Sequence, residues 1–186
     1  MHRTLLIFVI AGSAWLTGCA GVVSLHPLAV PNGEDTIFDP ALMGTWEGVK
    51  ADSKGLKTKY VVDRAESGYK VTALSGSEKI EGTMHLMKVG KRYLLDVLCP
   101  SDGAPPPVHI FLKLRLEKDA AWLAEMDTPW LKDQIEARTE LRHEVVLEDG
   151  ERVVLTGSAA ELHRHFLPLA NDDRSFASES ELRRIK

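Results

Sequence analysis

The chain has 186 residues, of which 27 are acidic and 23 are basic, so its formal net charge is −4. This length is enough for one domain with a single sizeable core. The slight acidic excess offers no electrostatic case for a nucleic-acid partner, because such proteins carry a basic patch or stripe.

The N-terminus has the pattern of an export signal. Met1 to Thr4 contain one cation, Arg3, and an apolar run then extends from Leu5 to Leu16. At about 12 residues this run is shorter than the roughly 20 needed to cross a bilayer. A charged start, a short apolar core and small residues before a cleavage point are typical of a secretory signal peptide. The alternative is a buried N-terminal helix of a cytosolic domain.

Leu16-Thr17-Gly18-Cys19 directly follows the apolar run and resembles the lipobox of bacterial lipoprotein precursors. The resemblance implies cleavage between Gly18 and Cys19 and acyl chains on Cys19, so residues 1–18 are the expected signal peptide. Two or more chains anchor a protein stably, at about 0.8 kcal/mol per buried methylene. In this family, a residue other than Asp after the cysteine, here Ala20, points to the outer membrane, facing the periplasm.

Residues 19–37 are expected to form the lipidated N-terminus and a tether, because glycines and prolines there interrupt any periodicity. A tether of this length would place the domain tens of ångströms from the membrane at most. Leu25, Leu28 and Val30 leave open the alternative that the tether packs partly on the domain. The globular domain is expected to span residues 38–186.

The domain opens with a short helical turn followed by a strand. Asp39 is a good N-cap, Pro40 a good first helical residue, and Gly44 ends the turn before Trp46. This turn followed by Gly44-Thr45-Trp46 resembles the entrance of a lipocalin or wider calycin barrel. The resemblance implies that Trp46 plugs one end of a barrel beneath a short helix.

Apolar residues then alternate with polar ones over a series of strands that short turns separate. In Val108–Glu117, for example, Ile110, Leu112 and Leu114 share one face while Lys113 and Arg115 face water. When an antiparallel meander of this kind closes into a barrel, its first and last strands pair and no strand edge stays exposed. We therefore predict a mainly β fold with a barrel-like sheet, or an α+β fold if the barrel is open. The expected strands are Thr45–Ala51, Lys57–Asp63, Tyr69–Ser75, Ile80–Val89, Arg92–Leu98, Val108–Glu117 and Ala121–Met126.

Two short helices are predicted to pack outside the sheet, near residues 128–137 and 158–170. The first begins with an Asp127 cap and Pro129, and the second with a capping box of Ser158 and Glu161. An Asp-Gly hairpin is expected between them. The C-terminal tail is either a final strand or a docking segment.

Motifs for catalysis, for a cofactor or for a metal are not found. His163 and His165 point about 200° apart on a helix and cannot share a metal. His85, His109 and His143 lie in separate strands, which a barrel could bring together, but no cysteine or carboxylate accompanies them at a matching position. Cys99 is expected to be a small buried residue at a strand end. The sequence therefore predicts a protein that is not an enzyme.

The predicted function is a binding module for an apolar or amphipathic small molecule, lined by Trp46, Tyr60, Tyr93 and Asp96. Asp96 has two alternatives: it faces outward near a helix N-terminus or an arginine, or it orients a ligand inside a cavity. The alternative function is a structural or assembly lipoprotein that meets another envelope protein through the sheet edge or the Trp130 helix. A cavity of a few hundred Å³ would favour the first function, and a barrel packed with side chains the second.

Overall fold

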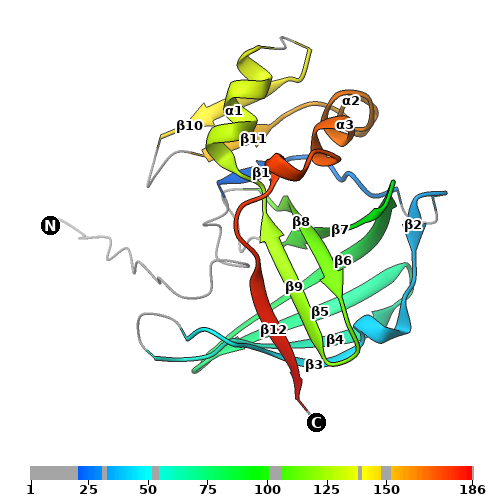
Figure 1. Ribbon diagram of the computed structural model, residues 1–186, viewed down its shortest axis with the longest axis vertical. Coiled ribbons are helices and arrows are strands. Elements are labelled where there is room, and N and C mark those ends of the chain that lie inside the picture. The colour runs from blue at the N-terminus through cyan, green and yellow to red at the C-terminus, as the bar shows by residue number, and fades with distance from the viewer. Residues whose placement is uncertain are drawn as a thin grey trace, which may run out of the picture.

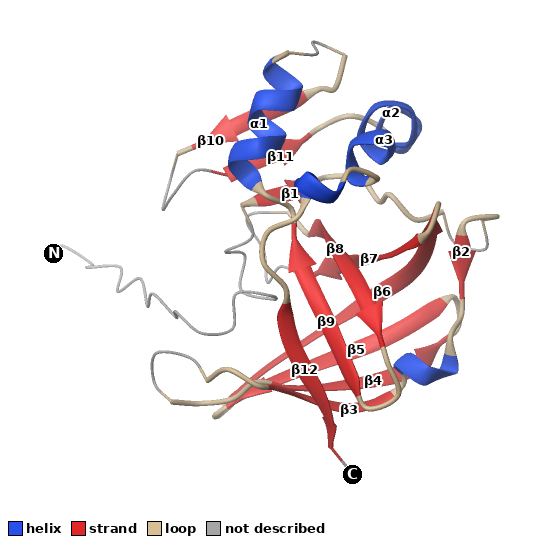
Figure 2. Cartoon of the chain, in the orientation of Figure 1, coloured by secondary structure: helices blue, strands red, loops and turns tan. Residues whose placement is uncertain are grey.

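The computed structural model describes residues 21–30, 33–51, 55–100, 106–137, 140–147 and 152–185. The predicted signal peptide and Cys19 lie outside these residues. The described chain is mainly β, with two short helical segments packed outside a barrel (Figures 1 and 2). The predicted fold class is confirmed.

Eight antiparallel strands form a closed barrel. The last strand of the chain closes it, because β12 pairs with β3 on one side and with β9 on the other. The C-terminal tail is thus a barrel strand and not a docking segment. The eight strands are β3 (Gly44–Gly48), β4 (Lys59–Ala65), β5 (Gly68–Ser75), β6 (Glu78–Val89), β7 (Arg92–Cys99), β8 (Val108–Leu116), β9 (Ala120–Glu125) and β12 (Ser180–Ile185).

Tight turns account for the meander. Ser75 pairs with Glu78 and Val89 pairs with Arg92, so two residues connect each of these strand pairs. The first connecting residue is a glycine with φ of +59° in both turns, Gly76 and Gly90. Glycine adopts this left-handed conformation without steric cost, and it matches the twist of the flanking strands.

A second layer extends from the outer face of the barrel. β1 (Val22–Ser24) pairs with β8 at a single position and runs parallel to β11 (Arg152–Leu155), which pairs with β10 (His143–Val146). The helices cover this extension, as Figure 1 shows. The two strands of the predicted hairpin therefore pair, but outside the barrel, and its Asp-Gly turn lies outside the described residues; β12 takes the place of the eighth strand. A short β2 (Thr36–Ile37) pairs with β6.

The helices begin where their caps predict. The Asp127 carboxylate accepts the Trp130 N–H at 2.8 Å at the start of α1 (Thr128–Glu136). Ser158 and Glu161 form the capping box of the second segment, which runs through α2 (Ala159–Glu161), a π-helical turn (Leu162–Phe166) and α3 (Leu167–Ala170). The π turn precedes Pro168, which cannot donate the hydrogen bond that a regular helix would require. Among the described residues, no helix is both long and apolar enough to cross a bilayer.

The fold has two apolar cores. One fills the barrel around Trp46, Tyr69 and Leu112. The other lies between the outer face of β6, β7 and β8 and the helices, around Leu94, Phe111 and Phe166. The middle of β7, residues 94–97, is consequently buried on both faces, whereas the outer face of β8 is covered at Phe111 and reaches solvent at Arg115.

The segment assigned to a tether is largely part of this second layer. Leu28 and Ala29 are almost fully buried, and the Gly21 carbonyl accepts the Val153 N–H at 2.7 Å. Of the three residues considered for packing, Leu28 is buried, whereas Leu25 and Val30 remain 40% and 50% exposed. The packed domain therefore begins by Gly21 and not near Phe38. Local periodicity missed this because β1 is short and pairs with strands far along the chain.

Candidate functional site

The barrel interior holds a small apolar cavity of about 60 Å³. All eight barrel strands contribute residues to its wall. Leu42, from the short helical turn η1 (Pro40–Leu42), also lines it. Its lining is Leu42, Trp46, Tyr60, Val62, Val71, Met84, Leu95, Val97, Leu112, Leu114, Ala121, Leu123 and Leu182.

Trp46 is held firmly against one side of this cavity. Only 1% of it is exposed, and its indole N–H donates to the Leu42 carbonyl at 2.9 Å. The Arg184 guanidinium from β12 stacks over its ring at 4.2 Å and donates to the Met43 carbonyl at 2.7 Å. The short turn, the indole and the closing strand are thus tied together.

Tyr60 is the polar residue of the cavity wall. It is 8% exposed, and burial raises the pKa of its phenol, which keeps the group neutral at physiological pH. A neutral phenol among aliphatic side chains supplies one hydrogen-bonding group and no charge. The cavity therefore has no group that attracts an ion.

The size of the cavity limits what it holds. Sites for drug-sized ligands have volumes of about 300–1,000 Å³, and a cavity of about 150 Å³ accepts benzene. A cavity of about 60 Å³ is smaller than both. The barrel is packed with side chains, so a fatty acid or similar amphipath does not fit in this conformation.

Asp96 does not face this cavity. Its neighbours Leu95 and Val97 point inward, so the alternation of β7 turns Asp96 to the outer face, where only 1% of its side chain is exposed. There its Oδ2 accepts the N–H groups of Leu28 and Ala29, each at 2.8 Å. The outward alternative was the right one, but the partners are backbone amides of the N-terminal segment and His109.

Tyr93 is the other residue that lines no part of the cavity. It lies two residues before Leu95 on β7, so its side chain starts from the same, inward face of the strand. However, it lies next to the β6–β7 turn and is 37% exposed. Of the four residues expected to surround a ligand, the barrel therefore brings together Trp46 and Tyr60 only. Alternation in the sequence predicts which face of the strand a side chain is on, but not whether that position lies in the middle of the barrel or near its rim.

His109 completes the cluster around Asp96. Its Nδ1 lies 2.6 Å from Asp96 Oδ1, and Ser24 is its direct neighbour across the β1–β8 pair. A serine, a histidine and an aspartate on one face invite comparison with a catalytic triad. However, the Ser24 hydroxyl is buried and donates to the His26 carbonyl at 2.8 Å. With its hydroxyl used in this way, Ser24 is not activated as a nucleophile, and the cluster serves to hold the N-terminal segment.

The two histidines of His163-Arg164-His165 contact different segments, as helical geometry predicts. His163 Nε2 lies 2.6 Å from the Leu28 carbonyl, while His165 Nδ1 lies 3.3 Å from Glu140. His85, His109 and His143 lie on β6, β8 and β10. In the described part of the chain, no group of three or more His, Cys, Asp or Glu residues is arranged to hold a metal.

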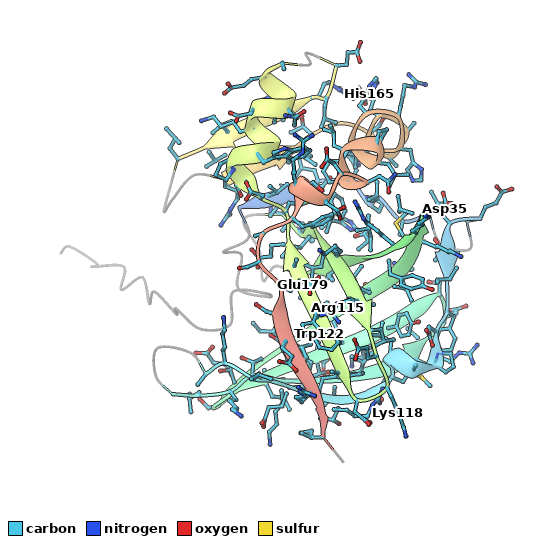
Figure 3. All side chains as sticks on the ribbon, in the orientation of Figure 1. Asp35, Arg115, Lys118, Trp122, His165 and Glu179 are labelled. Carbon is cyan, nitrogen blue, oxygen red and sulfur yellow. The ribbon has the colours of Figure 1, made fainter. Side chains whose placement is uncertain are left out.

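A second cavity of about 230 Å³ lies within the helical layer. Buried Ile135, Leu141 and Leu169 form its apolar part, and the polar side chains at its rim come from Glu140, Arg164 and His165. Figure 3 places His165 in this layer, at the opposite end of the molecule from Lys118. The sequence pattern gave no sign of this cavity, because its walls come from α1, the residues after it and the second helical segment.

The outer face of β8, β9 and β12 is charged and internally paired. The Arg115 guanidinium stacks on Trp122 at 3.5 Å and forms ion pairs with Glu117 and Glu179. Figure 3 shows Arg115, Trp122 and Glu179 close together on this face. Such a solvated network needs no ligand to satisfy it.

The chain matches no model of a known protein family, no curated protein and no solved structure.

Proposed function

We propose that this chain is a lipid-anchored protein of the bacterial cell envelope, held in the outer membrane through acyl chains on Cys19 and facing the periplasm. The support is the short apolar run that ends in Leu16-Thr17-Gly18-Cys19. The turn and Gly44-Thr45-Trp46 support a relationship to the lipocalin and calycin barrels, in which case the barrel is a variant with an added helical layer.

The position of β1 bears on how such an anchor would act. Only Ala20 separates Cys19 from Gly21 in the sequence, and Gly21 is hydrogen-bonded to Val153 of β11. Two residues reach about 7 Å at most. The lipid would then hold the domain at the membrane surface, and not at the end of the long flexible tether expected from the sequence.

We infer that the domain itself has a structural or assembly role. The observation that carries this inference is the filled barrel, whose cavity of about 60 Å³ does not accommodate an apolar or amphipathic ligand of lipid size. The same observation speaks against the small-molecule binding module, unless the barrel opens.

The sheet offers one surface suited to a protein partner. Among the described residues, β10 pairs on one side only, with β11, so its other edge is open. Val145 and Leu147 at this edge are 38% and 75% exposed. An extended segment of another envelope protein can add to such an edge through main-chain hydrogen bonds, with apolar side chains packing beside it.

The anchor is tested by labelling cells with radioactive palmitate. We expect label on the wild type and on Cys99→Ala, which removes the other cysteine, and none on Cys19→Ser. Equal label on all three proteins would overturn the lipid anchor.

The assembly role is tested with a photo-crosslinking amino acid in place of Leu147 and, as a control, in place of Lys118 at the far end of the barrel (Figure 3). We expect one discrete crosslinked protein from position 147, recovered in proportion to the chain, and none from position 118. Native mass spectrometry of the detergent-solubilised protein gives the second measurement. A non-covalent lipid-sized adduct without a protein partner would favour the binding module instead.

A further inference from the structure

The cavity in the helical layer has a composition different from that of the barrel. Ile135, Leu141 and Leu169 are at most 5% exposed and form an apolar floor. At about 230 Å³ the space exceeds the cavity of about 150 Å³ that accepts benzene. A six-membered ring with a short substituent therefore fits, whereas a long acyl chain does not.

The rim of this cavity has one cation without an ion-pair partner among the described residues, Arg164. The carboxylate of Glu140 lies 3.3 Å from His165 Nδ1, and 72% of the Glu140 side chain is exposed to solvent. Arg164 lines the cavity from the exposed side of the helix. Its guanidinium presents several N–H donors in a fixed plane, a geometry that matches a carboxylate.

The local backbone explains why this rim exists. Arg164 and His165 lie in the π-helical turn Leu162–Phe166 that precedes Pro168. A π turn widens a helix and re-aims its side chains, and such turns are frequent at functional sites. Pro168 itself lines the cavity, so the residue that favours the π turn also forms part of the wall.

We propose that this cavity binds a small amphipathic anion, with an aromatic or short aliphatic group on Leu141 and Leu169 and its carboxylate on Arg164. The proposal goes beyond the assembly role and does not depend on the lipid anchor. Direct contact with the Arg164 guanidinium above an apolar floor favours a carboxylic acid over the corresponding alcohol or amine.

The test uses three probes of nearly the same shape: phenylacetate, 2-phenylethanol and 2-phenylethylammonium. Each is titrated into the ¹⁵N-labelled protein, and amide shifts are followed by two-dimensional NMR. We expect phenylacetate alone to saturate, with shifts concentrated at Glu140, Leu141, His165 and Leu169. Equal shifts with all three probes would mean simple apolar partitioning, and the absence of shifts at these residues up to 20 mM, a concentration on the order of that used for weak ligands, would mean no site. Either result overturns the proposal.

Two variants and one control test whether phenylacetate binds in this cavity. Arg164→Gln removes the exposed cation without altering the buried floor, and we expect it to weaken phenylacetate binding about three- to tenfold. Arg183→Gln, which removes an exposed arginine of β12 in the barrel, is the matched control and should leave binding unchanged. Leu169→Phe fills the cavity and should abolish binding, provided that its NMR spectrum remains that of a folded protein. Unchanged affinity in Arg164→Gln would overturn the role of the cation.

Discussion

Asp96 provides the strongest test of how the N-terminal segment is attached to the barrel. Its carboxylate is buried on the outer face of β7 and accepts the N–H groups of Leu28 and Ala29 through one oxygen, Oδ2. The other oxygen, Oδ1, faces His109 Nδ1. Asp96→Ala would leave both amides and the imidazole without their acceptor in a region that excludes water.

The expected cost follows from these contacts. A buried donor left without an acceptor costs about 1–3 kcal/mol, so two amides give about 2–6 kcal/mol for Asp96→Ala. Asp96→Asn has the same shape, and its remaining oxygen can accept both amides. Its NH₂ group can donate to His109 Nδ1 once the imidazole proton moves to Nε2. Removing the charge also removes the cost of burying it, so we expect a loss below about 2 kcal/mol for this variant.

Two measurements separate local from global effects. Chemical denaturation gives the free energy of unfolding of the wild type, the two variants and Asp63→Ala, an exposed carboxylate of β4 that should change stability by about 0.5 kcal/mol or less. Hydrogen exchange reports the opening of the segment itself. A local loss of about 3 kcal/mol would accelerate exchange at the Leu28 and Ala29 amides roughly a hundredfold.

The reasoning is refuted if Asp96→Ala loses less than about 1 kcal/mol and the Leu28 and Ala29 amides exchange at the wild-type rate. Equal losses for Asp96→Ala and Asp96→Asn would instead mean that the negative charge, and not the hydrogen bonds, holds the segment.

Three further predictions concern the helical layer and the barrel core. His163→Ala, which loses the contact with the Leu28 carbonyl, should reduce the free energy of unfolding by about 1 kcal/mol in denaturant titrations. His165→Ala, whose imidazole faces the exposed carboxylate of Glu140, should cost about 0.5 kcal/mol or less, and equal losses would contradict this. Hydrogen bonds from Arg142 and Ser158 lower the pKa of Glu161 from 4.5 to about 2, so its stabilising contribution is complete above about pH 4.5 and is lost as the pH falls towards 2. The stability difference between wild type and Glu161→Gln should shrink over that range, and a difference that stays constant would exclude the linkage. Burial raises the pKa of the Cys99 thiol to about 11, which lowers its thiolate fraction at pH 8 about a hundredfold relative to a pKa of 9; we expect Ellman's reagent to label it only after unfolding, and rapid labelling of the native protein would be inconsistent with its position.

The sequence alone was enough to predict seven of the eight barrel strands, their turns and the helix caps, because each depends on neighbours within a few residues. Alternation in Val108–Leu116, the glycine turns and the Ser158–Glu161 capping box are local in this sense. The structure shifts strand ends by a few residues but preserves this order.

Only the tertiary structure showed the features that depend on pairing between strands far apart in the sequence. β12 closes the barrel by pairing with β3, which lies more than a hundred residues earlier, and β1 joins β8 to β11. Because the second core covers the outside of β7, both faces of that strand are apolar, and its sequence did not reveal which face Asp96 occupies. The volumes of the two cavities depend on how side chains from many strands and helices meet, so only the folded chain could distinguish the filled barrel from the open space beside Arg164.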